Sequence, residues 1–410
     1  MKEILRKILK WKLRLLAKLT IRKYQPGIIG ITGSVGKTST KEAIYTVLRS
    51  IRNIRVSQGN FNNEIGLPLT ILGNWDKLGG FGFWCKVFFV SLLRLIFRMN
   101  YPELLVLEYG ADHPGDLRYL LDIAKPQIGV VTAIGDIPVH VEFYSGPDAV
   151  AREKGYLVEA LMSAGFAILN YDDEAVLGMK ERTRAHVVTY GFNEGAELRI
   201  TNFQNLMEED RPEGISFKLE HGGSFVPVRL EDCFGKAQAY AAAVAAAVGL
   251  AFGINLVKIA EALNYYQAPS RRMKLIAGLK GSYIIDDSYN ASPLAMRAAL
   301  DTLKSLGKGR KIAILGDMLE IGKYTLEAHE AIGMLAGKFL DILVTVGLRA
   351  KFIAEAANNA GLAKKNIFSF DEAEEAKEKV QELIKKGDLI LVKASRVIGL
   401  DKVVEEIRQI

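Results

Sequence analysis

Cysteine is almost absent from this 410-residue sequence, in which only Cys85 and Cys233 occur. The two residues lie far apart, and neither has a partner cysteine at the spacing of a metal site. This scarcity argues against a disulfide framework and a zinc site, and it favours a reducing compartment, here the cytoplasm. The composition, with 49% hydrophobic and 25% charged residues, is that of a globular protein long enough for two or three domains.

Acidic residues are almost absent from the first 23 positions, where Glu3 stands against nine lysines and arginines. This segment contributes a charge of +8, whereas the whole chain carries +7, so the remaining residues sum to about −1. The basic character therefore belongs to one terminal arm, and no nucleic-acid partner is expected.

Long apolar runs are also absent from this arm, because lysines and arginines interrupt each of them. Apolar side chains nevertheless recur at helical spacing: Ile4, Ile8, Trp11, Leu15 and Leu19, with Leu5, Leu9, Leu13 and Leu16 beside them. No small-residue cleavage site follows, so the arm is neither a signal peptide nor a membrane span. We expect residues 1–26 to form a basic amphipathic helix that either lies on an anionic membrane, at its inner face, or docks on its own protein.

A second apolar segment, residues 79–99, is likewise interrupted by lysine and arginine. Two interpretations remain open for it. It is either a second interfacial helix beside the arm, in contact with the same membrane, or a core helix of the surrounding domain.

Short apolar strands alternate with helices from Gly27 onward, which indicates an α/β fold with a largely parallel sheet. The strands expected in this part are Gly27–Thr32, Leu104–Leu107, Ile128–Thr132 and Phe166–Leu169. A meander of short strands is expected at 196–231 and a buried helix at 237–250. A second alternating region has expected strands Tyr283–Asp286, Lys311–Leu315, Ile342–Val346 and Leu389–Lys393. The sequence thus predicts a P-loop central domain at 27–267, with the apolar insert 79–99, and a Rossmann-like C-terminal domain at 268–410.

The strongest functional signal is the segment Thr32-Gly33-Ser34-Val35-Gly36-Lys37-Thr38, between an expected strand and an expected helix. Glycines let backbone N–H groups turn toward phosphate oxygens, and the helix N-terminus favours negative charge. Lys37 would neutralise the β- and γ-phosphates of ATP, and the Thr38 hydroxyl would reach Mg²⁺. A strict P-loop has glycine where Ile31 stands, so this loop is a variant. The residues expected to hold the nucleotide are Gly33, Ser34, Val35, Gly36, Lys37, Thr38 and Ser39.

Further motifs follow in order along the chain. They are Gly59-Asn60-Phe61-Asn62-Asn63-Glu64-Ile65-Gly66-Leu67-Pro68, Glu108-Tyr109-Gly110-Ala111-Asp112-His113-Pro114-Gly115, Asp286-Asp287-Ser288-Tyr289-Asn290-Ala291-Ser292-Pro293, Leu315-Gly316-Asp317-Met318-Leu319-Glu320-Ile321-Gly322 and Lys393-Ala394-Ser395-Arg396. With the variant loop, they resemble the Mur ligases, and most of all the member that adds D-alanyl-D-alanine to a UDP-N-acetylmuramoyl-tripeptide in peptidoglycan synthesis. The resemblance extends through nearly all of residues 27–410.

The resemblance implies an ATP-dependent ligase that works in two steps. A substrate carboxylate attacks the γ-phosphate of ATP, and the incoming amine then attacks the resulting acyl phosphate and releases phosphate. Since acyl phosphates hydrolyse, the two domains are expected to close and exclude water.

Metal ligands are expected at the ends of strands and in the helix that follows. Glu108 ends an apolar strand, where a lone carboxylate needs a partner; a divalent cation is one, and a salt bridge or helix cap is the alternative. The resemblance assigns Thr38 and Glu108 to one Mg²⁺, and His140 and Lys154 to a second. It also implies that CO₂ carbamylates Lys154, which converts the cation into an anionic ligand.

The remaining site residues also come from the resemblance. Arg272 is assigned to the transferring phosphate, although neighbouring Arg271 leaves a one-residue ambiguity. Asp287 is assigned to the ATP ribose, with Asn290 beside it. Residues assigned to the other substrates are Asn62, Asn63, His329, Lys393 and Ser395, and the implied catalytic set is Lys37, His140, Lys154 and Arg272.

Two features depart from the family pattern. About 28 residues precede the phosphate loop, where family members carry a domain that grips the UDP-sugar. The substrate that would carry the UDP-sugar, called the acceptor below, is therefore expected to be held by the other domains, by a partner or on a lipid. In addition, Ala237 and Ala241 stand where the family has the His and Asn that contact adenine, and Gln238 is a candidate substitute.

Three functions remain in competition. The first is the D-alanyl-D-alanine-adding ligase. The second is another amide ligase of this fold, such as a folylpolyglutamate synthetase-like enzyme or one for a different or lipid-linked wall precursor. The third is a P-loop protein that binds nucleotide without ligation. The Asp-Asp-Ser-Tyr-Asn and Gly-Asp-Met-Leu-Glu motifs favour the first, and no Asn-Lys-x-Asp guanine signature supports a switch GTPase.

Overall fold

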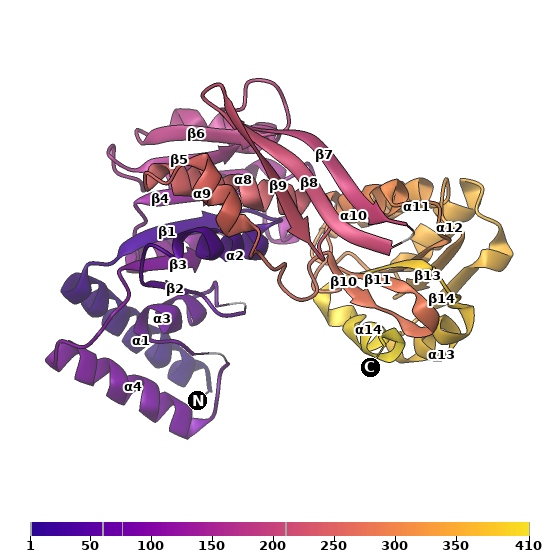
Figure 1. Cartoon of the computed structure of the whole chain (residues 1–410). Coiled ribbons are helices and arrows are strands. Elements are labelled where there is room, and N and C mark those ends of the chain that lie inside the picture. The colour runs from indigo at the N-terminus through magenta and orange to yellow at the C-terminus, as the bar shows by residue number, and fades with distance from the viewer. Residues whose placement is uncertain (1, 60, 76, 210, 410) are drawn as a thin grey trace. The chain divides into compact units, whose positions relative to one another are not determined.

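The computed structural model describes residues 2–59, 61–75, 77–209 and 211–409 (Figure 1). Asn60, part of one motif quoted above, lies outside the described residues. By contacts the chain divides into two compact units. The first unit comprises Met1–Ile134, Asp148–Arg199 and Ala241–Ala262, and the second comprises Gly135–Pro147, Ile200–Tyr240 and Leu263–Ile410.

A parallel sheet organises the first unit. Its strands are β1 (Gly27–Thr32), β2 (Ile54–Val56), β3 (Leu104–Glu108), β4 (Ile128–Val131), β5 (Phe166–Asn170) and β6 (His186–Gly191), in the order β2-β3-β1-β4-β5-β6. The helices are α1 (Lys2–Tyr24), α2 (Lys37–Leu48), α3 (Gly66–Leu72), α4 (Phe81–Ile96), α5 (Asp116–Ile123), α6 (Pro147–Glu159), α7 (Glu174–Leu177), α8 (Lys236–Ala251), of which the residues up to Tyr240 belong to the second unit, and α9 (Leu256–Leu263). The predicted strands are confirmed, and the parallel register brings the ends of β1, β3 and β4 to one edge of the sheet.

Beyond β6 the sheet continues as β7 (Leu198–Glu208), β8 (Arg211–His221) and β9 (Ser224–Glu231), which gives nine strands in all. β8 and β9 form an antiparallel hairpin. Along β9, buried and exposed residues alternate, as expected for a strand with one covered face. The predicted meander at 196–231 is present, but β7 and β8 have 11 residues each and are longer than the short strands expected.

The C-terminal part of the second unit is built on a six-stranded sheet. Its strands are β10 (Lys274–Ala277), β11 (Tyr283–Asp286), β12 (Lys311–Gly316), β13 (Ile342–Val346), β14 (Ile367–Phe370) and β15 (Leu389–Lys393), in the order β10-β11-β15-β12-β13-β14. All pairs are parallel except β10 with β11. The helices are α10 (Pro293–Ser305), α11 (Thr325–Ala336), α12 (Ala350–Asn359), α13 (Ala373–Leu383) and α14 (Asp401–Ile407). This is the predicted Rossmann-like α/β arrangement.

Helix α1 divides into three stripes. Leu13, Leu16 and Ala17 are buried, and the helix contacts α3, α4 and α5. A second stripe, Arg6, Lys10, Arg14 and Lys18, forms ion pairs with Glu64 and Asp122. The stripe noted in the sequence, Ile4, Ile8, Trp11, Leu15 and Leu19, is exposed. The helix thus docks on its own protein and still presents an apolar face outward.

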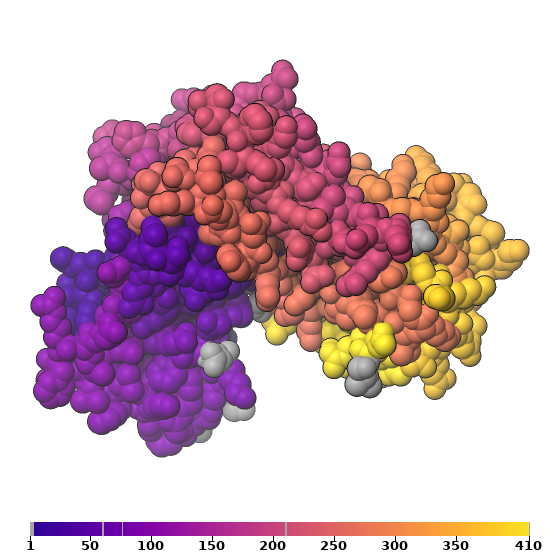
Figure 2. All heavy atoms as spheres, viewed as in Figure 1, coloured from indigo at the N-terminus to yellow at the C-terminus, as the bar shows by residue number. Residues whose placement is uncertain are grey.

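Helix α4 repeats this arrangement on the segment 79–99. Val87 and Ser91 are buried toward the protein, whereas Phe81, Phe89, Leu92 and Ile96 are exposed. The helix packs against α1, and Lys23 of α1 donates hydrogen bonds to the carbonyls of Arg94, Leu95 and Phe97. Helices α1 and α4 lie at the surface of the first unit, in indigo and purple (Figures 1 and 2). Among the described residues, no helix is long and apolar enough to cross a bilayer.

Candidate active site

The phosphate loop connects β1 to α2 and has a backbone that requires glycine at two positions. Gly33 has φ +138° and Gly36 has φ +90°, and a Cβ on Gly33 would overlap the Thr132 hydroxyl. The loop is held by backbone bonds from Ser34 and Val35 to the carbonyl of Ala133, of 2.7 and 3.2 Å. The α2 N-terminus, capped by no side chain, therefore begins beside a loop of fixed shape, as an anion site requires.

The charged groups of this loop gather at the carboxyl ends of the strands. Lys37 Nζ donates to the carbonyl of Gly33 at 2.6 Å, so the lysine folds over its own loop. Thr38 Oγ1 donates to Glu108 Oε2 at 3.4 Å, which places the predicted hydroxyl and carboxylate ligands side by side. Glu108 is buried at the end of β3.

Lys41 is a residue of this site that sequence reasoning missed. It is buried, with its Nζ 3.1 Å from Glu108 Oε1 and hydrogen-bonded to the carbonyl of Ser57 at 2.6 Å. Lys41 follows Lys37 by four residues, so the two lie on the same face of α2. This spacing is the feature of the sequence that could have pointed to Lys41. Glu108 therefore forms the salt bridge that was the alternative to a metal, with Lys41, and it also contacts the Thr38 hydroxyl.

Lys154 is buried in α6 rather than solvated. Burial, together with the charge of Lys37, lowers the pKa of Lys154 to about 7. Its neighbour Glu153 is also buried and accepts hydrogen bonds from the backbone N–H groups of Gly115 and Leu117, at 3.0 and 2.9 Å. Glu153 thus fixes the start of α5, and Lys154 is held as an amine that is largely uncharged above neutral pH.

The residues present fit a nucleotide and Mg²⁺. The Ser34 hydroxyl is buried without a hydrogen-bond partner among the described residues. It belongs to the loop in which phosphate oxygens would accept hydrogen bonds. Thr38 and Glu108 offer oxygen ligands, which Mg²⁺ prefers. Within the described ranges no group of three or more His, Cys, Asp or Glu side chains stands ready for a metal, so such an ion would take further ligands from phosphate and water.

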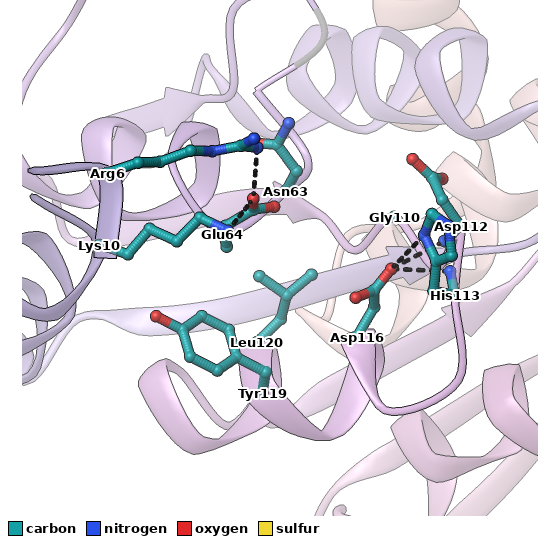
Figure 3. A pocket seen from close by; sticks show the side chains of 10 residues that line it. All are labelled: Arg6, Lys10, Asn63, Glu64, Gly110, Asp112, His113, Asp116, Tyr119 and Leu120. Atoms are coloured by element: carbon teal, nitrogen blue, oxygen red, sulfur yellow. Dashed lines mark hydrogen bonds and ion pairs between the residues drawn. The ribbon is translucent and has the colours of Figure 1, made fainter. Parts of the chain in front are cut away.

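A cavity of about 470 Å³ opens beside the residues that follow the carboxyl end of β3 (Figure 3). Asn63 lines it, and its side chain accepts the backbone N–H groups of Ile65 and Gly66, which fixes the entry to α3. The carbonyl of Asn62 accepts the N–H of Gly110, two residues beyond Glu108, at 2.7 Å. The predicted substrate residue Asn62 is thus joined to the segment that follows Glu108, and its neighbour Asn63 lines the cavity.

In the second unit, three predicted residues form one cluster. Lys393 Nζ lies 2.5 Å from Asp287 Oδ2 and donates to the carbonyl of Asn290 at 2.9 Å. Asp287 Oδ1 accepts the backbone N–H of Met273 at 3.2 Å. Lys393 and Asp287 are buried, so each neutralises the other's charge.

The two neighbouring arginines have different partners. Arg271 forms an ion pair of 3.0 Å with Asp401, whereas the Arg272 guanidinium stacks 4.0 Å from the Tyr289 ring centroid. Gln238 donates to the carbonyl of Arg272 and accepts from the Tyr266 hydroxyl, at 2.8 and 2.7 Å. Both ends of this buried amide are thus engaged within the protein, and a contact of Gln238 with adenine stays a prediction.

The other predicted residues, His140, His329 and Ser395, lie in the second unit around the loop 317–322, and His329 reaches this loop from helix α11. His140 lies 2.8 Å from Glu320. His329 is fully buried, and burial lowers its pKa; it contacts the carbonyl of Thr325 through Nδ1 and accepts the N–H of Met318 through Nε2. Ser395 Oγ accepts the N–H of Leu319 at 2.9 Å. His329 and Ser395 therefore hold this loop, and substrate contact by their side chains stays a prediction.

Two family models match most of the chain. The Mur ligase middle domain matches residues 31–77 and 89–249, and the Mur ligase glutamate ligase domain matches residues 271–396. The gap at 78–88 falls in the apolar segment that includes the start of α4.

Curated relatives and solved structures agree with these matches. The UDP-N-acetylmuramoyl-tripeptide--D-alanyl-D-alanine ligase of Bacillus subtilis is 30% identical over 397 residues, covering 96% of this chain and 79% of the relative. The ligase of the same name from Mycobacterium bovis is 33% identical over 92% of this chain and 72% of its own length. The crystal structure of MurF ligase from Thermotoga maritima in complex with ADP superposes with a TM-score of 0.81 at 26% identity, covering 97% of this chain and 83% of that one. From the site geometry and these matches together, the chain belongs to the Mur ligase family.

Proposed function

We propose that this protein is an ATP-dependent amide ligase of peptidoglycan synthesis that adds D-alanyl-D-alanine to a UDP-N-acetylmuramoyl-tripeptide. The observation that carries the proposal is the phosphate loop with Thr38 and Glu108 at its side, in a chain related over 96% of its length to a ligase of that name. ATP is the expected energy source, because a MurF structure at 26% identity holds ADP.

Each residue of the first unit has a definable task in such a reaction. The loop N–H groups and Lys37 bind the triphosphate and spread the charge that develops on the transferred group. Mg²⁺ held by Thr38 and Glu108 would neutralise phosphate charge. The buried Lys41 keeps Glu108 in place next to Thr38. The roles assigned to Arg272, Asp287, His140 and a second Mg²⁺ remain predictions.

The decisive assay measures phosphate released from ATP in the presence of UDP-N-acetylmuramoyl-tripeptide, with and without D-alanyl-D-alanine. We expect release to depend on all three substrates and to fall by at least about a hundredfold in Lys37→Ala, since electrostatic stabilisation of this kind contributes several kcal/mol. Nucleotide binding without turnover would point to the non-ligase alternative, and turnover with glutamate as the amine would point to a folylpolyglutamate synthetase-like enzyme.

The carbamate on Lys154 is part of the proposal. A neutral amine is the form that attacks CO₂, and burial beside Lys37 keeps a large fraction of Lys154 neutral at pH 7. With ¹³C-labelled bicarbonate we expect a carbamate carbon resonance in the wild-type protein that is missing from Lys154→Gln. The same resonance in both proteins would contradict the assignment.

We further propose that the protein works in the cytoplasm and touches the inner face of an anionic membrane through α1 and α4. The exposed fractions of Trp11, Phe81 and Phe89 are 60%, 86% and 63%, large for aromatic side chains. Exposed cations accompany them, including Lys7, Lys12, Lys86 and Arg98, and residues 77–102 contain no acid. Apolar faces flanked by lysine and arginine are complementary to an anionic lipid surface.

Vesicle co-sedimentation tests this surface. We expect the protein to bind phosphatidylglycerol vesicles, to bind phosphatidylcholine vesicles less, and to lose binding in a Trp11→Glu/Phe89→Glu variant. Leu348→Glu is the control, because Leu348 is also exposed but lies in the second unit. Equal binding by wild type and the double variant would remove the proposal.

A further inference from the structure

The cavity that Asn63 lines is formed partly by the N-terminal helix. Its volume of about 470 Å³ is in the range of small-molecule sites. Arg6 and Lys10 of α1 form one side, and Asp112, His113 and Asp116 form the other, with Tyr119 and Leu120 between them (Figure 3). The cavity lies at the carboxyl end of β3, and ligands of open α/β sheets bind at that end of the strands.

The α1 side of the cavity carries more positive than negative charge. Arg6 and Lys10 are one helical turn apart, and both contact the single carboxylate of Glu64, at 3.2 and 2.6 Å. Burial alone would raise the pKa of Glu64, but the hydrogen bond and charges of these cations outweigh it and lower the pKa. Glu64 is therefore ionised, and two cations facing one carboxylate leave one positive charge available to a ligand.

The opposite side is acidic and shaped by backbone hydrogen bonds. Asp116 Oδ2 accepts the N–H groups of Asp112 and His113 at 3.1 and 2.8 Å, which fixes the turn before α5. A ligand that spans the cavity would thus meet cations at one end and carboxylates at the other. A peptide that bears both an acidic group and an amine matches this distribution.

We propose that Arg6 and Lys10 of α1 bind an acidic group of the acceptor substrate, UDP-N-acetylmuramoyl-tripeptide, in this cavity. The N-terminal helix is then part of the acceptor site. The inference rests on the proposed ligase function and adds a task for α1 that the middle-domain match, which begins at residue 31, does not include. The acidic group is a carboxylate of the peptide or a phosphate of its nucleotide carrier, since guanidinium and ammonium groups recognise both.

The same helix supplies a matched control. Lys18 lies two turns beyond Lys10 in the same stripe, contacts the carboxylate of Asp122 at 2.9 Å, and has the same side-chain exposure of 30%. It does not line the cavity. Lys10→Gln and Lys18→Gln therefore remove equivalent surface ion pairs, and only the first alters the proposed site.

The experiment uses the full chain and titration calorimetry with UDP-N-acetylmuramoyl-tripeptide, in parallel with the KM and kcat of the ligase assay. We expect the dissociation constant and the KM of UDP-N-acetylmuramoyl-tripeptide to rise by roughly tenfold in Lys10→Gln and by up to roughly a hundredfold in Arg6→Gln/Lys10→Gln, the loss typical of charged hydrogen bonds. The KM of ATP should stay unchanged, and Lys18→Gln should bind like the wild type. Thermal melts of all variants check that the fold is intact.

The source of the acidic group is identified by repeating the titration with N-acetylmuramoyl-tripeptide, which lacks the nucleotide. If the double variant also binds this compound more weakly than the wild type, Arg6 and Lys10 contact a peptide carboxylate. If the two proteins bind it equally, the cations contact a phosphate. Equal acceptor affinity of wild type and double variant overturns the proposal, as does a failure of the wild-type chain to bind either compound. Wild-type binding without phosphate release would instead overturn the ligase function and leave this site standing.

Discussion

At the scale of single residues, the buried Lys154 determines a pH dependence. Its pKa in the folded chain is lowered from 10.5 to about 7, mainly by burial and then by Lys37. Between pH 7 and 10.5 the unfolded chain therefore binds the proton that the folded chain has lost. The free energy of unfolding must rise with pH in this window, by up to about 1.4 kcal/mol per unit from this one group.

Urea unfolding in CO₂-free buffer at pH 7 and pH 8.5 tests this slope. The wild type should gain stability between the two values, and Lys154→Met should gain less because it has no amine to titrate. At pH 7 and below, the variant should be the more stable protein, because the cost of a buried cation is gone. Identical pH profiles for the two proteins would contradict the shifted pKa.

Lys41 gives a second prediction at this scale. It faces Glu108 at 3.1 Å, and both side chains are buried, so Lys41→Met leaves an uncompensated carboxylate. We expect a loss of about 3–5 kcal/mol in unfolding free energy. Mg²⁺ with ATP should restore more stability to the variant than it adds to the wild type, because a metal would supply the missing positive charge.

The double variant Lys41→Met/Glu108→Gln separates charge from packing. If the ion pair is the cause, removing both charges should recover most of the lost stability. No recovery would mean that the effect of Lys41→Met comes from lost packing or from the lost bond to Ser57.

At the scale of the element, α1 contains two leucines with opposite surroundings. Leu13 is fully buried between α1 and its neighbours, whereas Leu15, two residues later, is 42% exposed. Leu13→Ala should cost about 2–5 kcal/mol and Leu15→Ala well under 1 kcal/mol. Thermal or urea unfolding measures both, and similar losses in the two variants would show that α1 does not dock as described.

In α1, the local sequence encodes the helix but not the face that turns inward. Helical periodicity predicted the helix, because spacing of apolar residues is a local property. It singled out the stripe from Ile4 to Leu19 with Leu13 and Leu16 beside it, yet Leu13 and Leu16 are buried and the spaced stripe is exposed. With leucines on several sides, the stripe that turns inward depends on α3 and α4, whose positions no spacing within α1 encodes.

The same limit applies to the site. The phosphate loop was predictable because Gly33, Gly36 and Lys37 are adjacent in sequence and their backbone requirements are local. Lys41 contacts Glu108, which lies 67 residues further along the chain, and Gln238 contacts Tyr266, 28 residues further along. Only the folded chain brings these residues together. Strand β14 was missed because it is short and its residues are only partly buried.

At the scale of the whole molecule, substrate binding and stability are linked. A ligand that binds only the folded chain stabilises it, by about 2.7 kcal/mol at a hundredfold excess over its dissociation constant. Mg·ATP should therefore raise the melting temperature of the wild type by several degrees. Lys37→Ala should show little shift of its melting temperature with nucleotide, because the side chain that folds over the phosphate loop and would bind the triphosphate is missing.

GTP in place of ATP extends this test to the base. Ala237 and Ala241 have no side-chain polar atom to read adenine, and the amide of Gln238 is engaged by Tyr266 and the carbonyl of Arg272. If these positions are the only readers of the base, ATP and GTP should shift the melting temperature nearly equally, because the loop recognises phosphates common to both. A shift with ATP several times that with GTP would place base recognition on other residues and would leave the phosphate loop assignment intact. No shift of the wild type with either nucleotide would contradict that assignment itself.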